Sequence, residues 1–186
     1  MGQPVPQTEQ LLWCIGPPLQ QSFAQLINEE SAPHAVELYR ERFAEIGLYE
    51  NSLYPEIPGV LESLKQSGAT LHVASSKPHV YVNRILEHFQ LDHFFKSVFG
   101  AELNGTRGDK TTLLQHALEQ TECSARDAIM IGDRHHDCTG ALNNAMGFIG
   151  VLYGYGSSEE LLQAGALRTV DAPHQLVEFC ARDNSG

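Results

Sequence analysis

The stretch IMIGDRHHDCTGA, residues Ile129 to Ala141, joins an apolar run to a segment of helical character and places two aspartates four residues apart at the junction. A polar turn that contains Gly132 and Asp133 follows the apolar run. Strands that end in a polar turn and lead into a helix are the units of parallel α/β sheets, which bind ligands at the carboxyl ends of their strands. The stretch therefore predicts an α/β fold and the position of a site.

The same alternation extends to both sides of this stretch, from Pro58 to the end of the chain. Segments of helical periodicity separate short apolar runs at residues 70–74, 97–101, 128–132, 148–152 and 168–170. Strands separated by helices indicate right-handed βαβ units in a parallel sheet. Local signals mark two boundaries: Gly68 stands between a helix and a strand, and Ser157 with Glu160 has the spacing of a capping box.

The first 54 residues have a different pattern. Three segments, residues 7–15, 18–27 and 32–47, have amphipathic helical periodicity, and no convincing strand lies between them. The joint YPEIPG contains Pro55, Pro58 and Gly59, all of which discourage helix. We therefore expect a helical domain over residues 1–54 and an α/β domain over residues 55–186.

Composition narrows the class of partner and the compartment. The chain carries 12 Lys and Arg against 23 Asp and Glu, a formal charge of −11, which argues against nucleic acid or an anionic membrane as partner. The four cysteines form no C-x-x-C pair, which indicates a reduced, cytoplasmic protein. No apolar run approaches the length of a membrane span, and the first residues lack the features of a signal peptide.

Asp133 and Asp137 are candidate metal ligands. Mg²⁺ is a hard cation that usually takes one or two carboxylates together with phosphate and water oxygens. The alternative is that an aspartate here is only a helix N-cap. The adjacent His135 and His136 suggest a transition metal, but neighbours in sequence rarely converge on one ion. Solvent-exposed histidines are the better interpretation.

Two further segments carry groups suited to a phosphate. In LHVASSKPH, Ser75 and Ser76 follow a predicted strand, and their hydroxyls suit phosphate oxygens, although a Ser N-cap with Pro78 in the first helical turn is equally compatible. In GTRGDKTTLL, Lys110 stands at a predicted helix start, where a cation opposes the helix dipole unless an anion lies nearby. That conflict slightly favours a functional lysine.

The order of these segments, VASSKP, then GDK, then IMIGDRHHD, resembles the second, third and fourth motifs of the haloacid dehalogenase superfamily. Further segments resemble its phosphoglycolate-phosphatase-like branch and together cover nearly the whole chain: IGPPL, YRERFAEIGLYEN, YPEIPGVLESL, ELNGTRGDK and GVLYGYGSSEEL. The resemblance implies a Rossmann-like core, a small mobile helical cap that closes over the substrate, a small phosphorylated metabolite as substrate, and Mg²⁺ as cofactor.

The resemblance also implies a role for each matched residue. Ser75 binds the transferring phosphoryl group. Lys110 neutralises that group and the nucleophile. Asp133 ligates Mg²⁺, and Asp137 supports the metal site without binding the ion directly.

The family's first motif, a strand ending in D-x-D-G-T whose first Asp attacks phosphorus, has no counterpart here. The chain contains no D-x-D, and its first aspartate is Asp92. We therefore expect a family member that lacks its N-terminal strand and is inactive or nearly so, because an aspartyl-phosphate mechanism needs that carboxylate. The missing strand would lie between the strands at 70–74 and 128–131, so we expect these two either to pair directly or to borrow a strand.

Two other functions stay open: a non-catalytic remnant that binds phosphate or another protein, and a phosphosugar mutase built on the same core. Substrate identity and oligomeric state have no signal in the sequence. Arg40 and Arg42, in YRERF, are either substrate ligands or part of a solvated helix face, and the solvated face is the stronger interpretation.

Overall fold

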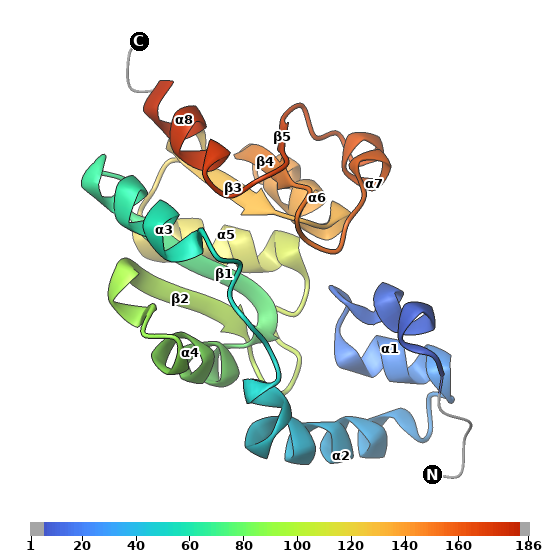
Figure 1. Cartoon of the computed structure of the whole chain (residues 1–186). Coiled ribbons are helices and arrows are strands. Elements are labelled where there is room, and N and C mark those ends of the chain that lie inside the picture. Colours follow the sequence, from blue (N-terminus) through green and yellow to red (C-terminus); the bar gives the residue numbers. More distant parts are fainter. Residues whose placement is uncertain (1–5, 183–186) are drawn as a thin grey trace. The chain divides into compact units, whose positions relative to one another are not determined.

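The computed structural model describes residues 6–182 (Figure 1), and its chain divides into two compact units, Met1–Asn51 and Ser52–Gly186. The described part of the first unit is helical, with η1 (Thr8–Cys14), α1 (Leu19–Leu26), α2 (Ala32–Glu45) and η2 (Gly47–Tyr49). The helix that the sequence indicated over residues 7–15 is present as a 3₁₀ helix and not as an α-helix. Its side chains are mostly exposed, so little burial stabilises full α-helical turns.

The second unit alternates helices and strands along its whole length, as the sequence predicted. Its helices are α3 (Ile57–Gln66), α4 (His79–His88), α5 (Lys110–Thr121), α6 (His135–Asn143), α7 (Ser158–Gln163) and α8 (Gln175–Arg182). Its strands are β1 (Leu71–Pro78), β2 (Phe95–Ala101), β3 (Ile129–Gly132), β4 (Gly147–Val151) and β5 (Thr169–Val170). Short 3₁₀ turns, η3 (Asp92–Phe94) and η4 (Ala125–Asp127), precede β2 and β3.

All strand pairs in this unit are parallel, which confirms the predicted α/β class. They form two sheets, one with the order β1-β2 and one with the order β3-β4-β5. Side chains alternate between the faces of β4: Ile149 and Val151 pack into a core with α3 and α8, whereas Phe148 packs into a core with α5, α6 and α7. Helices therefore cover both faces of the second sheet, as Figure 1 shows.

Among the described residues, β1 pairs only with β2. Strand β3 pairs only with β4, whose other edge pairs with β5. The expected direct pairing of the strands at 70–74 and 128–131 is therefore not formed, and that alternative was wrong. Helix α5 packs against both β1 and α6, so it connects the two sheets where β1 and β3 do not pair. The facing edges of β1 and β3 have no strand partner in the part of the chain that is described.

Strand β1 also ends later than the sequence indicated. It continues to Pro78, with an irregular register between Ser75 and Pro78, and Pro78 itself is the N-cap of α4. The alternative of a serine N-cap with proline in the first helical turn is thereby excluded. Ser75 and Ser76 belong to an extended segment at the carboxyl end of a strand.

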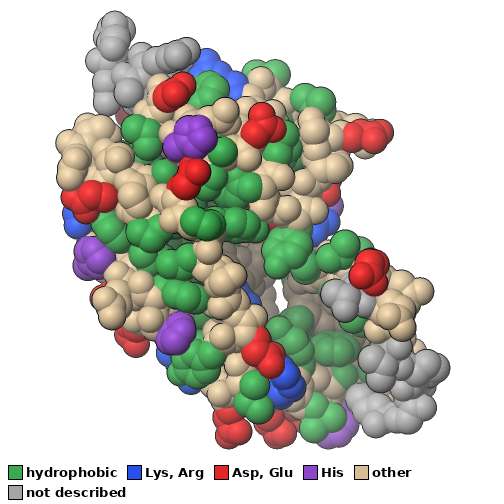
Figure 2. Space-filling view, in the orientation of Figure 1, with side chains coloured by type: hydrophobic (Ala, Val, Ile, Leu, Met, Phe, Trp, Pro, Cys, Tyr) green, Lys and Arg blue, Asp and Glu red, His purple; other side chains and the backbone are tan. Residues whose placement is uncertain are grey.

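The surface agrees with the scattered positive charge of the sequence. On the face drawn in Figure 2, Lys and Arg side chains lie singly among acidic, apolar and other side chains. None of the helices described is both long enough and apolar enough to cross a bilayer.

Candidate functional site

Lys110 is the residue that links the predicted motifs. Its Nζ donates to the Ala74 carbonyl oxygen in β1 at 2.9 Å and lies 2.9 Å from Asp137 Oδ1 in α6. Both charged side chains are nearly buried, with 9% of Lys110 and 11% of Asp137 exposed. Lys110 therefore connects β1, at the residue before Ser75, to the first turn of α6. The anion that a lysine at a helix start requires is Asp137.

Local sequence explains why α5 begins at Lys110. Asp109 is the N-cap, and its Oδ1 accepts hydrogen bonds from the backbone N–H groups of Thr111 at 2.9 Å and Thr112 at 3.3 Å. The hydrogen bond from the Thr112 hydroxyl, with those from the two amides, lowers the pKa of Asp109. Sequence reasoning missed this cap, although Asp followed by a helical stretch is its usual signal.

Ser75 is half-buried and lies directly after Ala74, whose carbonyl binds Lys110. Its Oγ accepts a hydrogen bond from the backbone N–H of Lys77 at 3.1 Å, which turns the chain locally at the strand end. Burial lowers the pKa of Lys77, which occupies the same segment. The structure thus places Ser75 beside the Lys110 contact through the backbone, without a hydrogen bond from its own hydroxyl to Lys110.

Asp133 and Asp137 lie on one turn but have different surroundings. Asp133 precedes the N-cap of α6, which is Arg134, so Asp133 is not the helix cap. Its Oδ2 accepts the Tyr155 backbone N–H at 2.7 Å. Asp137 Oδ2 accepts the Arg134 backbone N–H at 3.2 Å, while its Oδ1 pairs with Lys110.

These contacts determine how the site fits a metal ion. No group of three or more His, Cys, Asp or Glu side chains in the described part of the chain is arranged to hold one. Asp137 already pairs with Lys110, whereas Asp133 Oδ1 accepts no hydrogen bond and forms no ion pair among the described residues. One carboxylate suits Mg²⁺ when phosphate and water complete its shell, and it does not suit an ion that needs an all-protein cage.

The histidine pair departs from expectation. His135 and His136 are half-buried, not solvent-exposed, and their ring centroids are 3.7 Å apart. Burial, with the neighbouring His135 and Arg134, lowers the pKa of His136. His135 Nδ1 lies 2.7 Å from Glu160 Oε1, so its partner is a carboxylate from α7. Sequence reasoning had assigned Glu160 only to a local capping box.

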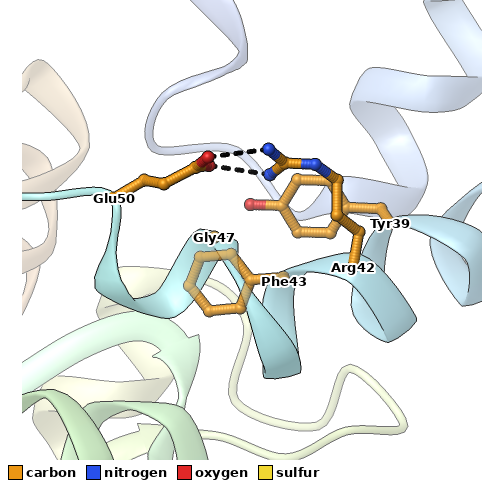
Figure 3. Close-up of a pocket in the computed structure, with 5 residues that line it drawn as sticks. All are labelled: Tyr39, Arg42, Phe43, Gly47 and Glu50. Atoms are coloured by element: carbon orange, nitrogen blue, oxygen red, sulfur yellow. Dashed lines mark hydrogen bonds and ion pairs between the residues drawn. The ribbon is translucent and has the colours of Figure 1, made fainter.

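A shallow pocket of about 240 Å³ lies within the helical unit (Figure 3). The residues that line it are Tyr39, Arg42, Phe43, Gly47 and Glu50. Both terminal nitrogens of Arg42 donate to the Glu50 carboxylate, at 2.7 and 2.8 Å, and both side chains are more than half exposed. Arg42 is therefore engaged at the surface, whereas Arg40 is half-buried. The pocket contains none of the motif residues.

Comparisons with known proteins agree with this architecture. Residues 1–151 match the family described as "Haloacid dehalogenase-like hydrolase". A "5'-nucleotidase" of Pseudomonas aeruginosa is 43% identical over 183 residues, a match that covers 97% of this chain and 78% of that protein. The crystal structure of a predicted phosphatase from Clostridium acetobutylicum is 41% identical with a TM-score of 0.91, and covers 96% of this chain and 83% of its own.

Another relative, which is named for a different activity, is similar over a shorter region. The "Tyrosine-protein kinase PtkA" of Mycobacterium tuberculosis is 35% identical over 159 residues, which cover 86% of this chain and 55% of that protein. More distant relatives include phosphoglycolate phosphatases. These similarities confirm the family resemblance of the sequence.

Proposed function

The chain belongs to the haloacid dehalogenase-like hydrolase family, and from this premise we propose that its α/β unit is the phosphate-binding part of a Mg²⁺-dependent phosphatase of small phosphomonoesters. Relatives named as a 5'-nucleotidase and as phosphoglycolate phosphatases support this substrate class. We assign the cap to residues 1–54 and the core to residues 55–186. We propose a cytoplasmic location, which is supported by the free thiols of Cys14, Cys123 and Cys138, because thiols stay reduced in that compartment.

One observation carries the proposal: Lys110 Nζ lies 2.9 Å from both the Ala74 carbonyl oxygen and Asp137 Oδ1. This nearly buried ammonium group joins the β1 residue that precedes Ser75 to the first turn of α6, which follows Asp133 in the chain. An ammonium group and hydroxyls at strand ends bind phosphate oxygens through charge and hydrogen bonds. In the proposed site, Ser75 and Ser76 donate hydroxyl hydrogen bonds to the phosphoryl group, and Lys110 balances its charge.

Asp133 is the residue that would hold Mg²⁺, through Oδ1, with phosphate and water as the other ligands. The ion would neutralise charge on the transferring phosphoryl group. Asp137 has a different role in this proposal: its carboxylate pairs with Lys110 and keeps the ammonium group directed toward β1. It supports the site through Lys110 and is not itself a ligand of the ion.

The attacking carboxylate is not among these residues. Phosphoryl transfer through an aspartyl phosphate needs a carboxylate in line with phosphorus, and the 186 residues contain no D-x-D. Asp133 is needed for the metal and Asp137 is paired with Lys110. We therefore propose that the 186-residue chain does not turn substrate over. The facing edges of β1 and β3, which have no strand partner among residues 6–182, support a position for an added strand that bears the nucleophile.

The second candidate function is a phosphate-binding protein without catalysis. It is favoured by two observations: Lys110 is held beside the residue before Ser75, and the 186 residues contain no D-x-D. Both candidates predict phosphate binding by the chain. They differ in whether catalysis returns when a nucleophile strand is supplied.

The test compares the 186-residue chain with the same chain extended at its N-terminus by an apolar strand ending in D-x-D-G-T. The chain alone should hydrolyse p-nitrophenyl phosphate at the background rate with Mg²⁺ present. The extended chain should be active, and its variant with the first Asp of the added motif changed to Asn should not. Robust Mg²⁺-dependent hydrolysis by the purified 186-residue chain would disprove the proposal. Inactivity of the extended, folded chain would favour the non-catalytic candidate.

A further inference from the structure

Glu160, in α7, binds the turn between β3 and α6 through a single oxygen. Its Oε1 lies 2.9 Å from the His135 backbone nitrogen, 2.7 Å from His135 Nδ1 and 2.9 Å from Arg134 Nε. These partners are 25 and 26 residues away in sequence. The contacts are partly shielded from water, since 24% of the Glu160 side chain and 13% of Arg134 are exposed.

The contacts are not part of the local cap of α7. Ser157 Oγ accepts the Glu160 backbone N–H at 3.1 Å, which is one half of the capping box that the sequence predicted. The other half, in which the Glu160 carboxylate accepts from the Ser157 backbone N–H, is not formed in the described structure. The carboxylate is directed to the β3–α6 turn instead, so its main partners are tertiary.

The bound form of Glu160 is the carboxylate. Burial by itself raises the pKa of a carboxyl group, but here hydrogen bonds from the His135 amide, Arg134 and the His135 ring outweigh it and lower the pKa to about 2. Glu160 is therefore ionised and engaged near neutral pH, where the site would work.

Three consecutive residues of the turn are bound to the segment between residues 155 and 160. Asp133 accepts the Tyr155 backbone N–H at 2.7 Å, and Arg134 and His135 both donate to Glu160. The Arg134 backbone N–H in turn donates to Asp137. Glu160 therefore acts on the residue that follows Asp133 and on the amide at the start of α6.

We propose that Glu160 is a positioning residue that holds Asp133 in the orientation needed to bind a divalent cation. This inference depends on the proposed role of Asp133 as the metal ligand. Replacement of a residue that orients a metal ligand without binding the metal itself typically changes metal affinity by about 10–100-fold. Glu160 acts through the Asp133–His135 turn, since it has no contact with the expected cation position.

A competing explanation is charge alone. Loss of the Glu160 charge would leave the Arg134 guanidinium uncompensated near the site and would repel a cation without any loss of position. The two explanations differ for Arg134→Gln. Charge alone predicts that this variant binds the cation more tightly, whereas positioning predicts weaker binding, because the Arg134 contact to Glu160 is lost.

The experiment uses the full 186-residue chain with Mn²⁺ as the probe. Free Mn²⁺ is measured by electron paramagnetic resonance for the wild type, Glu160→Gln, Arg134→Gln and the control Glu159→Gln. Glu159 precedes Glu160 on the same helix turn and accepts only an exposed hydrogen bond from Gln163, at 3.1 Å. We expect Mn²⁺ affinity to fall about tenfold or more in the first two variants and to stay unchanged in the control.

Amide hydrogen exchange supplies a readout that does not need the metal. The His135 backbone N–H should exchange at least about tenfold faster in Glu160→Gln than in the wild type, while amides in β4 keep their wild-type rates. Glu159→Gln should leave the His135 amide unchanged. Circular dichroism identifies any variant that fails to fold, and Arg134→Gln alone still separates positioning from charge.

Each contrary outcome has a distinct meaning. Wild-type Mn²⁺ affinity together with wild-type His135 exchange in Glu160→Gln would overturn the inference. Tighter binding in Arg134→Gln with weaker binding in Glu160→Gln would replace it with the charge explanation. If the wild type itself bound no Mn²⁺, the metal assignment of Asp133 would fail, and the exchange of the His135 amide would still decide whether Glu160 holds the turn.

Discussion

The buried pair Lys110–Asp137 gives the most direct quantitative prediction. We consider Lys110→Met, Asp137→Asn and the double variant. Asn keeps the size of Asp137, which matters because that side chain packs closely against Gly132. Each single variant leaves one charge in a nearly buried position without its partner, whereas the double variant removes both charges.

The magnitude follows from the geometry. At a separation of 2.9 Å and an effective dielectric constant of about 20, the attraction between the charges is about 6 kcal/mol, most of which is offset by the cost of removing them from water. Loss of one partner typically costs about 3–5 kcal/mol. Native domains are stable by only about 5–15 kcal/mol, so each single variant should lose a large share of its stability.

Urea unfolding followed by circular dichroism measures these free energies. The double variant should lose less than the sum of the two single losses by at least about 2 kcal/mol, which is the coupling energy of the pair. Glu50→Gln is the matched control, since the Arg42–Glu50 pair has a similar length of 2.7 Å but is mostly exposed. This variant should leave the unfolding free energy nearly unchanged. Single losses as small as that of the control, or strictly additive losses, would refute the reasoning.

Three further predictions concern the surrounding residues. Asp133→Ala should abolish Mg²⁺ binding by the chain, because Asp133 is the carboxylate with an open oxygen, and calorimetry that finds unchanged binding would remove it from the site. The pKa of the Glu160 carboxyl is lowered from 4.5 to about 2, so this group should contribute up to about 3 kcal/mol of stability above pH 4.5. That stability should be lost as the pH falls toward 2. In Glu160→Gln the urea midpoint should depend less on pH across this interval. Gly140→Ala should destabilise the fold by about 1–3 kcal/mol, since the added Cβ would lie 2.7 Å from Lys110 Cγ. Gly59→Ala, which has open space around the added Cβ, should not destabilise it. Equal thermal midpoints for the two variants would contradict this packing.

Patterns of local origin were readable from the sequence. Short apolar runs and the period-3.6 distribution of apolar residues between them located the strands and helices of the second unit. A strand covered by helices on both faces is apolar along its length, whereas a helix buries one face. Gly68 ends its helix with φ of 90°, a conformation that glycine adopts without a Cβ clash. Ser75, Lys110 and Asp133 do lie at the strand ends and the helix start that the sequence marked, and their roles in binding stay predictions.

Pairings between distant segments were decided only by the tertiary structure. Nothing in the sequence indicates that Asp137 pairs with Lys110, or that the Glu160 side chain binds His135 of another helix. Likewise, the separation of β1 from β3 and the packing of α5 against both β1 and α6 have no signal in the sequence. The physical reason is the same in each case: local propensity depends on neighbours in the chain, whereas a buried charge or a strand edge is satisfied by whichever group the fold brings within about 3 Å.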